Sequence, residues 1–270
     1  MTGREWRPGV PGNRDDMSTA GTEPDARFGA RALFAVVALV LVAVPFGLLL
    51  FLVEDRWSPL SQVDGGARDE LHALALQHDA LVAAMKVLST IGSAVVYLPL
   101  FAAVTAWLVW RRLPRLALFV VVTVAGSSLL NAIVKLAVDR ARPVVAEPVA
   151  HAGGLSFPSG HAQSAVVAAS VLLLVFLPLL RGAWRTVAVA AAFAFVLAIG
   201  FARVALGVHF VSDVLAGYTL GAAWVAAMIA AFNAWRRERG RPPADPAQGL
   251  EPQHPSRLAA DAPLQRDPVA

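Results

Sequence analysis

Long runs of apolar residues dominate this chain and restrict the folds that are open to it. A membrane-spanning helix needs about 20 mostly apolar residues. Six stretches meet that requirement: 31–53, 92–110, 116–138, 162–180, 186–206 and 213–235. Charged residues make up only 16% of the chain, against about 25% in soluble globular proteins. The sequence therefore predicts an all-α integral membrane protein whose six transmembrane helices form a bundle.

The distribution of lysine and arginine predicts the orientation of these helices. Cytoplasmic segments carry an excess of both residues. If the N-terminus lies inside, fourteen of them flank the inner ends of the helices and five lie in the outer loops. The first stretch is too long for the core of a signal peptide, so it is read as an uncleaved helix. We therefore expect a multi-pass protein of the cell membrane with both termini in the cytoplasm.

The segments outside the six stretches are of two kinds. Residues 1–29 and 237–270 are rich in Pro, Gly, Ala and charge, and we expect disordered cytoplasmic tails around a membrane domain at 30–236. Between the first two stretches, apolar residues recur at helical spacing: Leu71, Leu74, Leu81, Val82 and Met85. This pattern predicts a helix along the outer membrane surface. A helix packed on the bundle would explain it equally well.

Three polar clusters lie near helix ends on the predicted outer side, where ionisable residues mark functional sites. In the first, Lys135, Asp139 and Arg142 follow the spacing i, i+4, i+7 and would share one helix face. Pro143 disfavours helical geometry at Arg142 and places it near the helix end. Lysine and arginine together hold phosphate oxygens well. The alternative is an ordinary surface ladder in which Asp139 bridges the two cations.

The second cluster is Pro158-Ser159-Gly160-His161, at the start of the fourth stretch. Serine is a favoured N-cap, and a helix N-terminus presents free N–H groups to an anion. Glycine lets the backbone approach that anion closely. The alternative is a plain capped turn with a histidine at the membrane interface.

The third cluster contains Arg203, His209 and Asp213. If His209 to Asp213 begin a helix, the i, i+4 spacing puts carboxylate and imidazole side by side. A carboxylate on one ring nitrogen fixes the tautomer and leaves the other nitrogen free to attack. The alternative is a salt-bridged pair at the start of a helix. All three alternatives would have to share one membrane face by accident, so together the clusters indicate a phosphate site.

At these residues the chain resembles the type 2 phosphatidic acid phosphatase superfamily, the lipid phosphate phosphatases related to bacterial acid phosphatases and vanadium haloperoxidases. The family pattern is K-x6-RP, then PSGH, then SR-x5-H-x3-D. This chain has KLAVDRARP, PSGH and ARVALGVHFVSD, and the resemblance covers about residues 88–235. One departure is Ala202, where the family has serine before the arginine of the third motif.

The resemblance implies a role for each motif residue. His209 would attack phosphorus and form a phosphohistidine, Asp213 would orient it, and His161 would protonate the leaving oxygen. The phosphoryl oxygens would be held by Lys135, Arg142, Ser159, Gly160 and Arg203. No metal or other cofactor is expected. The substrate would be the phosphomonoester or pyrophosphate of a membrane lipid: phosphatidic acid, phosphatidylglycerol phosphate or polyprenyl pyrophosphate. No nucleic-acid partner is expected.

Other functions use the same residues. A lipid phosphotransferase would replace water with an alcohol in the second step. A catalytically silent lipid-binding membrane protein would keep the pocket without the reaction. His151, His161 and His209 could instead form a three-histidine zinc site, although three nearby cations would repel the metal. The remaining histidines, His72, His78 and His254, are expected to be solvated.

Overall fold

The computed structural model describes residue 40 and residues 42–238, and every regular element within them is helical. These residues belong to one compact unit that begins at Leu39. A helix over Val42–Glu54 comes first. It is followed by α2 (Ser58–Leu76), α3 (Asp79–Ile91), α4 (Ala94–Trp110), α5 (Pro114–Val138), α6 (Gly160–Phe176), α7 (Ala183–Ala205) and α8 (Val211–Glu238). The predicted tails lie outside the described residues, except that α8 continues to Glu238.

Four helices are long and apolar enough to cross a membrane: Pro114–Val138, Gly160–Leu179, Ala183–Ala205 and Val211–Arg236. Each begins two or three residues before the predicted stretch. A fifth candidate is the pair α2 and α3, taken as one span bent by 116°. The helix Val42–Glu54 and α4 are apolar but shorter. The chain is thus a multi-pass membrane protein, while the prediction of six spans is not confirmed, and part of 31–53 lies outside the described residues.

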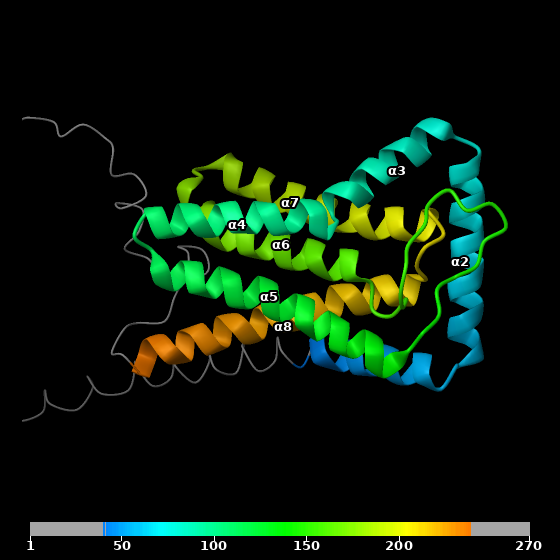
Figure 1. Cartoon of the computed structure of the whole chain (residues 1–270), viewed down its shortest axis with the longest axis horizontal. Helices are drawn as coiled ribbons and strands as arrows, with labels where there is room; N and C mark the ends of the chain where they lie inside the picture. The colour runs from blue at the N-terminus through cyan, green and yellow to red at the C-terminus, as the bar shows by residue number, and fades with distance from the viewer. Residues whose placement is uncertain (1–39, 41, 239–270) are drawn as a thin grey trace, which may run out of the picture. The chain divides into compact units, whose positions relative to one another are not determined.

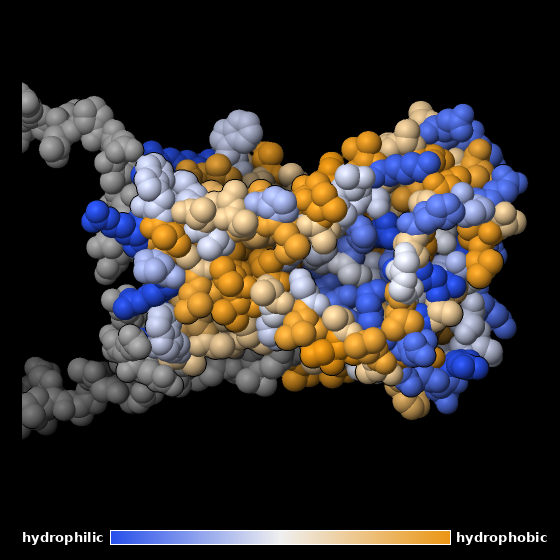
Figure 2. Space-filling model, in the orientation of Figure 1, coloured by the Kyte–Doolittle hydropathy of each residue, from blue (hydrophilic) through white to orange (hydrophobic). Residues whose placement is uncertain are grey.

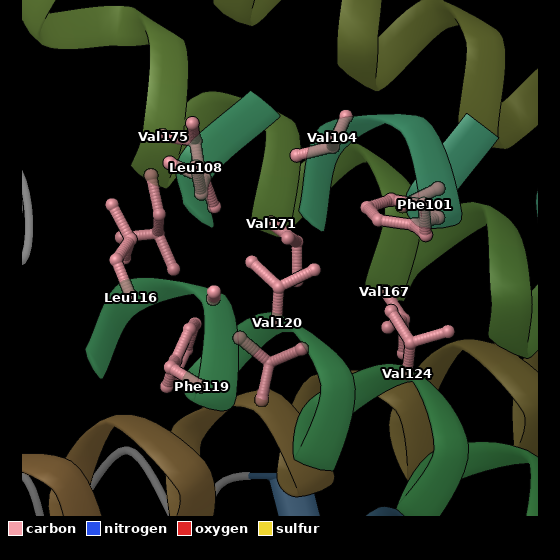
Figure 3. Close-up of a cluster of buried hydrophobic side chains, with 14 of the residues drawn as sticks. Phe101, Val104, Leu108, Leu116, Phe119, Val120, Val124, Val167, Val171 and Val175 are labelled. Carbon is pink, nitrogen blue, oxygen red and sulfur yellow. The ribbon is translucent and has the colours of Figure 1, made fainter. Parts of the chain in front are cut away.

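The apolar core lies where α4, α5 and α6 meet (Figure 3). Each helix contributes side chains at intervals of three or four residues, which place them on one face: Phe101, Val104 and Leu108 from α4, Leu116, Val120 and Val124 from α5, and Val167, Val171 and Val175 from α6. α6 also contacts α7 and α8. Many outward-facing residues are apolar as well, and in Figure 2 hydrophilic side chains gather at the end where α2 lies.

Two glycines allow α8 to lie directly against α6. A Cβ atom on Gly217 would lie 2.5 Å from the carbonyl oxygen of Ser159, and one on Gly221 would lie 3.0 Å from that of Gln163. Small residues permit such close backbone approach between membrane helices. The contact brings the first turns of the two helices together, and the Ser159 N–H donates to the Asp213 carbonyl at 2.9 Å.

The segment between the first two predicted spans forms two helices, not one. α2 and α3 meet at a sharp bend, and Figure 1 shows α2 running across the ends of other helices. α2 contacts α7 and α8, and α3 contacts α7. The buried residues of α2 are Asp64, His72 and Ala75. The structure therefore shows this segment packed on the bundle, and the prediction of a surface helix is not confirmed.

The prediction that His72 is solvated is wrong. The side chain is buried, with Nδ1 2.9 Å from the Ala205 carbonyl oxygen and Nε2 3.0 Å from that of Glu147. Sequence alone did not reveal these partners because both are backbone atoms far along the chain. His78 is exposed, and His254 lies outside the described residues.

Candidate active site

The first polar cluster spans a helix end. α5 stops at Val138, and Asp139 has φ of 49°, in the left-handed region that ends helices. Lys135 lies in the last turn and donates to the Leu155 carbonyl at 2.5 Å. The prediction that Lys135, Asp139 and Arg142 share a helix face is therefore wrong, because Arg142 belongs to the following loop. The bridging ladder is not formed: Asp139 is exposed and has no ion pair among the described residues.

Arg142 is held by backbone carbonyls next to His209. Its guanidinium donates to Gly153 and Gly154 on one side and to Val208, at 2.8 Å, on the other. Nη1 also lies 3.0 Å from Nε2 of His209. Burial lowers the pKa of Arg142, and the negative charge of Asp213 opposes that effect. The loop thus places a partly desolvated cation next to the imidazole ring of His209.

His209 and Asp213 are side by side, as their spacing predicts. His209 lies two residues before the start of α8, Asp213 lies in the first turn of that helix, and Nδ1 of His209 is 3.3 Å from Oδ2 of Asp213. A carboxylate accepts hydrogen bonds and a guanidinium donates them. Nδ1 therefore carries the proton that faces Asp213, and Nε2 presents its lone pair toward Arg142. The unprotonated nitrogen therefore faces the Arg142 cation.

The environment of His209 keeps its ring neutral. The side chain is 1% exposed. Burial lowers its pKa to about 4, with a smaller contribution from Arg203 and Arg142, and Asp213 opposes the shift. Since an imidazolium has no lone pair to donate, this shift leaves the ring capable of acting as a nucleophile at neutral pH.

The second cluster opens α6. Ser159 is the N-cap, and its Oγ accepts from the Ala162 N–H at 3.5 Å. Gly160 is the first helical residue, so its N–H has no partner within the helix. His161 follows, hydrogen-bonds the backbone of Ser89, and lies close enough to His209 and Arg203 for electrostatic interaction. The helix N-terminus and both histidines thus converge.

Arg203 completes the cluster from the last turn of α7. It is 5% exposed, and Nη1 donates to the Ser89 hydroxyl at 2.5 Å. Its buried Nε has no hydrogen-bond partner in the described part of the chain. Within that part, no ion pair involves Lys135, Arg142 or Arg203, although the three interact electrostatically. Three cations without a carboxylate of their own, one buried and two half-buried, provide a positively charged site that suits an anion.

Several polar residues at this site were missed by sequence reasoning. Arg140 pairs with Asp213 and Asp64, and Ser156 donates a hydrogen bond to Oδ2 of Asp213. Ser89 contacts both Arg203 and His161. Arg140 lies two residues before Arg142 and Ser156 three before Ser159, yet no spacing rule identifies either.

Ala202, the departure from the family pattern, lies in an apolar environment. It is fully buried and packs in a cluster with Ala75, Val82 and Met85 of α2 and α3. The methyl group of alanine packs here without needing a polar partner. The neighbouring Arg203 donates to the hydroxyl of Ser89 on α3.

The three-histidine zinc site is not formed. His151 is exposed in the loop before α6. Within residues 42–238, no three His, Cys, Asp or Glu side chains gather closely enough to hold a metal ion.

Comparison with known proteins gives consistent results. Residues 116–237 match the model of the PAP2 superfamily. Phosphatidylglycerophosphatase B of Bacillus subtilis (strain 168) is 34% identical over 152 residues, which cover 55% of this chain and 74% of that protein. The crystal structure of a transmembrane PAP2-type phosphatidylglycerolphosphate phosphatase from Bacillus subtilis aligns with a TM-score of 0.64 and 24% identity. The alignment covers 70% of this chain and 93% of the solved structure, which shows that the two proteins share a fold.

Proposed function

Because the chain belongs to the PAP2 superfamily, we propose that it is a lipid phosphatase that uses His209 as its nucleophile. The observation that carries this proposal is that Lys135, Arg142 and Arg203 interact electrostatically with one another beside a neutral imidazole. Arg142 and Arg203 also act on that ring, and Nη1 of Arg142 lies 3.0 Å from Nε2 of His209. Phosphoryl transfer depends mainly on positioning and on neutralising charge at the equatorial oxygens. A neutral imidazole next to a group of partly buried cations provides both.

The first step forms a phosphoenzyme. Nε2 of His209 attacks phosphorus, and the bond from phosphorus to the leaving oxygen breaks. His161 gives its proton to that oxygen. The three cations, the Ser159 hydroxyl and the Gly160 N–H hold the phosphoryl oxygens. Because the Ser159 oxygen accepts from Ala162, its hydrogen remains free to donate.

The second step returns the enzyme to its starting state. Water attacks phosphorus, His161 accepts its proton, and the P–N bond breaks to release inorganic phosphate. Asp213 keeps the Nδ1–H of His209 in place throughout and stabilises the positive charge that develops on the ring. No metal ion takes part in either step.

An apolar groove beside His161 supports a lipid substrate. It has a volume of about 480 Å³ and is lined by α4, α6 and α7, with Leu100, Ala168 and Ala192 among its residues. Gly92 lines its end, and a Cβ atom there would lie 3.6 Å from Cδ2 of His161. The groove thus runs from the proposed acid into the hydrophobic part of the bundle, where a hydrocarbon chain would be buried.

The relative named phosphatidylglycerophosphatase B makes phosphatidylglycerol phosphate the first substrate to test. Phosphatidic acid and polyprenyl pyrophosphate present the same terminal phosphate and are the other candidates.

We further propose that residues 30–236 form a six-span domain with both termini in the cytoplasm and the site at the outer membrane face. In this arrangement the stretch 31–53 and α4 also cross the membrane, and α2 with α3 covers the outer end. α4 has 17 residues, which is at the lower limit of about 17 for a span. The excess of lysine and arginine at the opposite end supports the orientation.

Phosphate release from purified lipid phosphates in detergent tests the function. We expect wild-type protein, but not His209→Ala, to release phosphate, with or without EDTA. Wild-type protein should also retain acid-labile, base-stable radiolabel from labelled lipid. Activity in His209→Ala equal to wild type would exclude the mechanism. Transfer of phosphate to added alcohols in place of water would show a phosphotransferase.

A further inference from the structure

A buried network joins the His209–Asp213 pair to α2 through residues that have no role in the steps above. Nη1 of Arg140 donates to Oδ1 of Asp213 at 2.6 Å, and Nη2 donates to Oδ2 of Asp64 at 2.8 Å. Asp64 is 1% exposed and the Arg140 side chain 18%. Asp64 lies outside the three motifs, and Arg140 falls in the variable interval of the first.

Asp64 also caps α8. Its Oδ1 accepts from the Ser212 N–H at 2.9 Å, and its Oδ2 accepts from the Ser212 hydroxyl at 2.5 Å. The first N–H groups of a helix have no partner within it, so a carboxylate from α2 satisfies one of them. Arg140 donates to the same hydroxyl at 2.7 Å. The turn that carries Asp213 is therefore attached to α2 at several points.

The network assigns the two oxygens of Asp213 to different partners. Oδ1 accepts from Arg140, while Oδ2 accepts from the Phe210 N–H at 2.9 Å, from Ser156 and from the Nδ1–H of His209. The Arg140 guanidinium is itself fixed by stacking over Phe210, with Cζ 4.3 Å from the ring centroid. Without Arg140, Oδ1 would be unpaired and the carboxylate could rotate.

We propose that Arg140 and Asp64 are positioning residues that hold Asp213, and through it His209, in the orientation needed for attack on phosphorus. Arg140 fixes the plane of the carboxylate, and Asp64 fixes Arg140 and the first turn of α8. α2 thereby becomes part of the catalytic apparatus although none of its side chains is proposed to touch the phosphate.

A purely structural role for this network makes a different prediction. Removing one member of a buried ion pair leaves an uncompensated charge and destabilises a protein strongly, whereas neutralising both is far less costly. The double variant Arg140→Gln/Asp64→Asn leaves only Asp213 without its cation and should therefore be more stable than Arg140→Gln, which leaves both carboxylates uncompensated. If the network only stabilises the fold, the activity of the double variant should recover together with its stability.

The kinetic test compares Arg140→Gln, Asp64→Asn and the double variant, each corrected for the folded fraction. We expect kcat to fall about 10- to 100-fold in Arg140→Gln and in the double variant, with little change in KM, because misplacement by about 1 Å has such an effect. Arg68→Gln is the matched control. Arg68 lies on α2, with Cζ 5.6 Å from the same ring centroid, but pairs with the exposed Asp69. The activity of Arg68→Gln should equal that of wild type.

If Arg140→Gln does not fold, the double variant carries the test. Wild-type kcat in the double variant, or a rise in KM alone, would overturn the proposal.

A second measurement does not depend on the proposed function. Nitrogen NMR of isotopically labelled histidine reports which ring nitrogen of His209 carries the proton, with the signal assigned by its loss in His209→Gln. We expect one tautomer, protonated at Nδ1, in wild type and Arg68→Gln, and a mixture in the double variant. An unchanged tautomer in the double variant would contradict the positioning role. If the double variant shows a mixture of tautomers but the wild-type protein releases no phosphate from any lipid, only the proposed function is refuted.

Discussion

The two ring nitrogens of His209 have different partners, and this difference determines its chemistry. Nδ1 faces Asp213 and Nε2 faces Arg142. In the proposed mechanism phosphorus approaches Nε2, and before reaction Arg142 lies 3.0 Å from that nitrogen. An incoming phosphate would accept hydrogen bonds from Arg142 and release the Nε2 lone pair for attack.

The lowered pKa of His209 predicts an unusual pH profile. In the proposed mechanism the neutral ring attacks and the protonated ring cannot, so we expect activity to persist as the pH falls to the pKa of His209, about 4. We expect the acidic limb of kcat/KM near that value, and not near the ordinary histidine pKa of about 6.5. The titration of the substrate phosphate must be measured separately and subtracted. A limb that stays near the ordinary value after this correction would contradict the assignment of His209 as a buried neutral base.

Arg142→Lys should reduce activity although it keeps the charge. The guanidinium uses three nitrogens to contact Gly153, Gly154 and Val208, and an ammonium cannot reproduce that fork. We expect kcat/KM to fall about 100-fold, the effect of losing one well-placed donor to the transition state. Arg68→Lys, on α2, is the control and should be unaffected. Full activity in Arg142→Lys would argue against direct phosphate contact.

At the scale of elements, close contact between α6 and α8 holds the second and third motifs together. A methyl group at position 217 would collide with the Ser159 carbonyl, so the helices would have to separate. We expect Gly217→Ala to lower the free energy of unfolding by about 1–3 kcal/mol, measured by denaturant titration in detergent, and to lower activity.

Gly66→Ala is the matched control, because a methyl group at this position of α2 meets no atom within 4 Å. Alanine is the better helix former, so this variant should be no less stable than wild type. Equal stability of the two variants would mean that the α6–α8 contact is looser than the structure has it.

The groove between α4, α6 and α7 predicts a dependence on the lipid tail. Ala192 lines it, whereas its neighbour Ala191 is exposed on the outside of α7. We expect Ala192→Phe to raise KM about tenfold for long-chain phosphatidic acid, the effect of displacing about two methylenes. A short-chain analogue should be hydrolysed as by wild type, and Ala191→Phe should behave as wild type on both. An equal effect of Ala192→Phe on both chain lengths would exclude the groove as the tail site.

At the scale of the whole molecule, the proposed orientation can be tested directly because the chain contains no cysteine. A membrane-impermeant thiol reagent added to intact cells should label Ala150→Cys, in the loop before α6. It should label Arg181→Cys, between α6 and α7, only after the cells are opened. The reverse result would invert the topology and move the site to the cytoplasmic face.

The sequence was most informative for long apolar helices and for residues close together in the chain. Four spans were located to within three residues because apolar composition alone identifies them. His209 and Asp213 were paired correctly because four residues of near-helical chain bring their side chains together. The spacing predicted that Arg142 lies on the same helix as Lys135, whereas it lies in the loop after α5. The left-handed turn at Asp139, which ends the helix, has no clear sequence signal. The two-helix form of 58–91 was missed because its bend depends on packing against α7.

The sequence by itself determined that the chain crosses a membrane several times, and it predicted the side chains that we propose for the phosphate chemistry. Composition and short-range spacing encode both. Only the tertiary structure decided that Nδ1 of His209 faces Oδ2 of Asp213 while Nε2 faces Arg142, and that Arg140 and Asp64 connect the same carboxylate to α2. These contacts join residues from 64 to 213, and their geometry follows from helix packing. No local pattern in the chain specifies how helices so far apart in sequence meet.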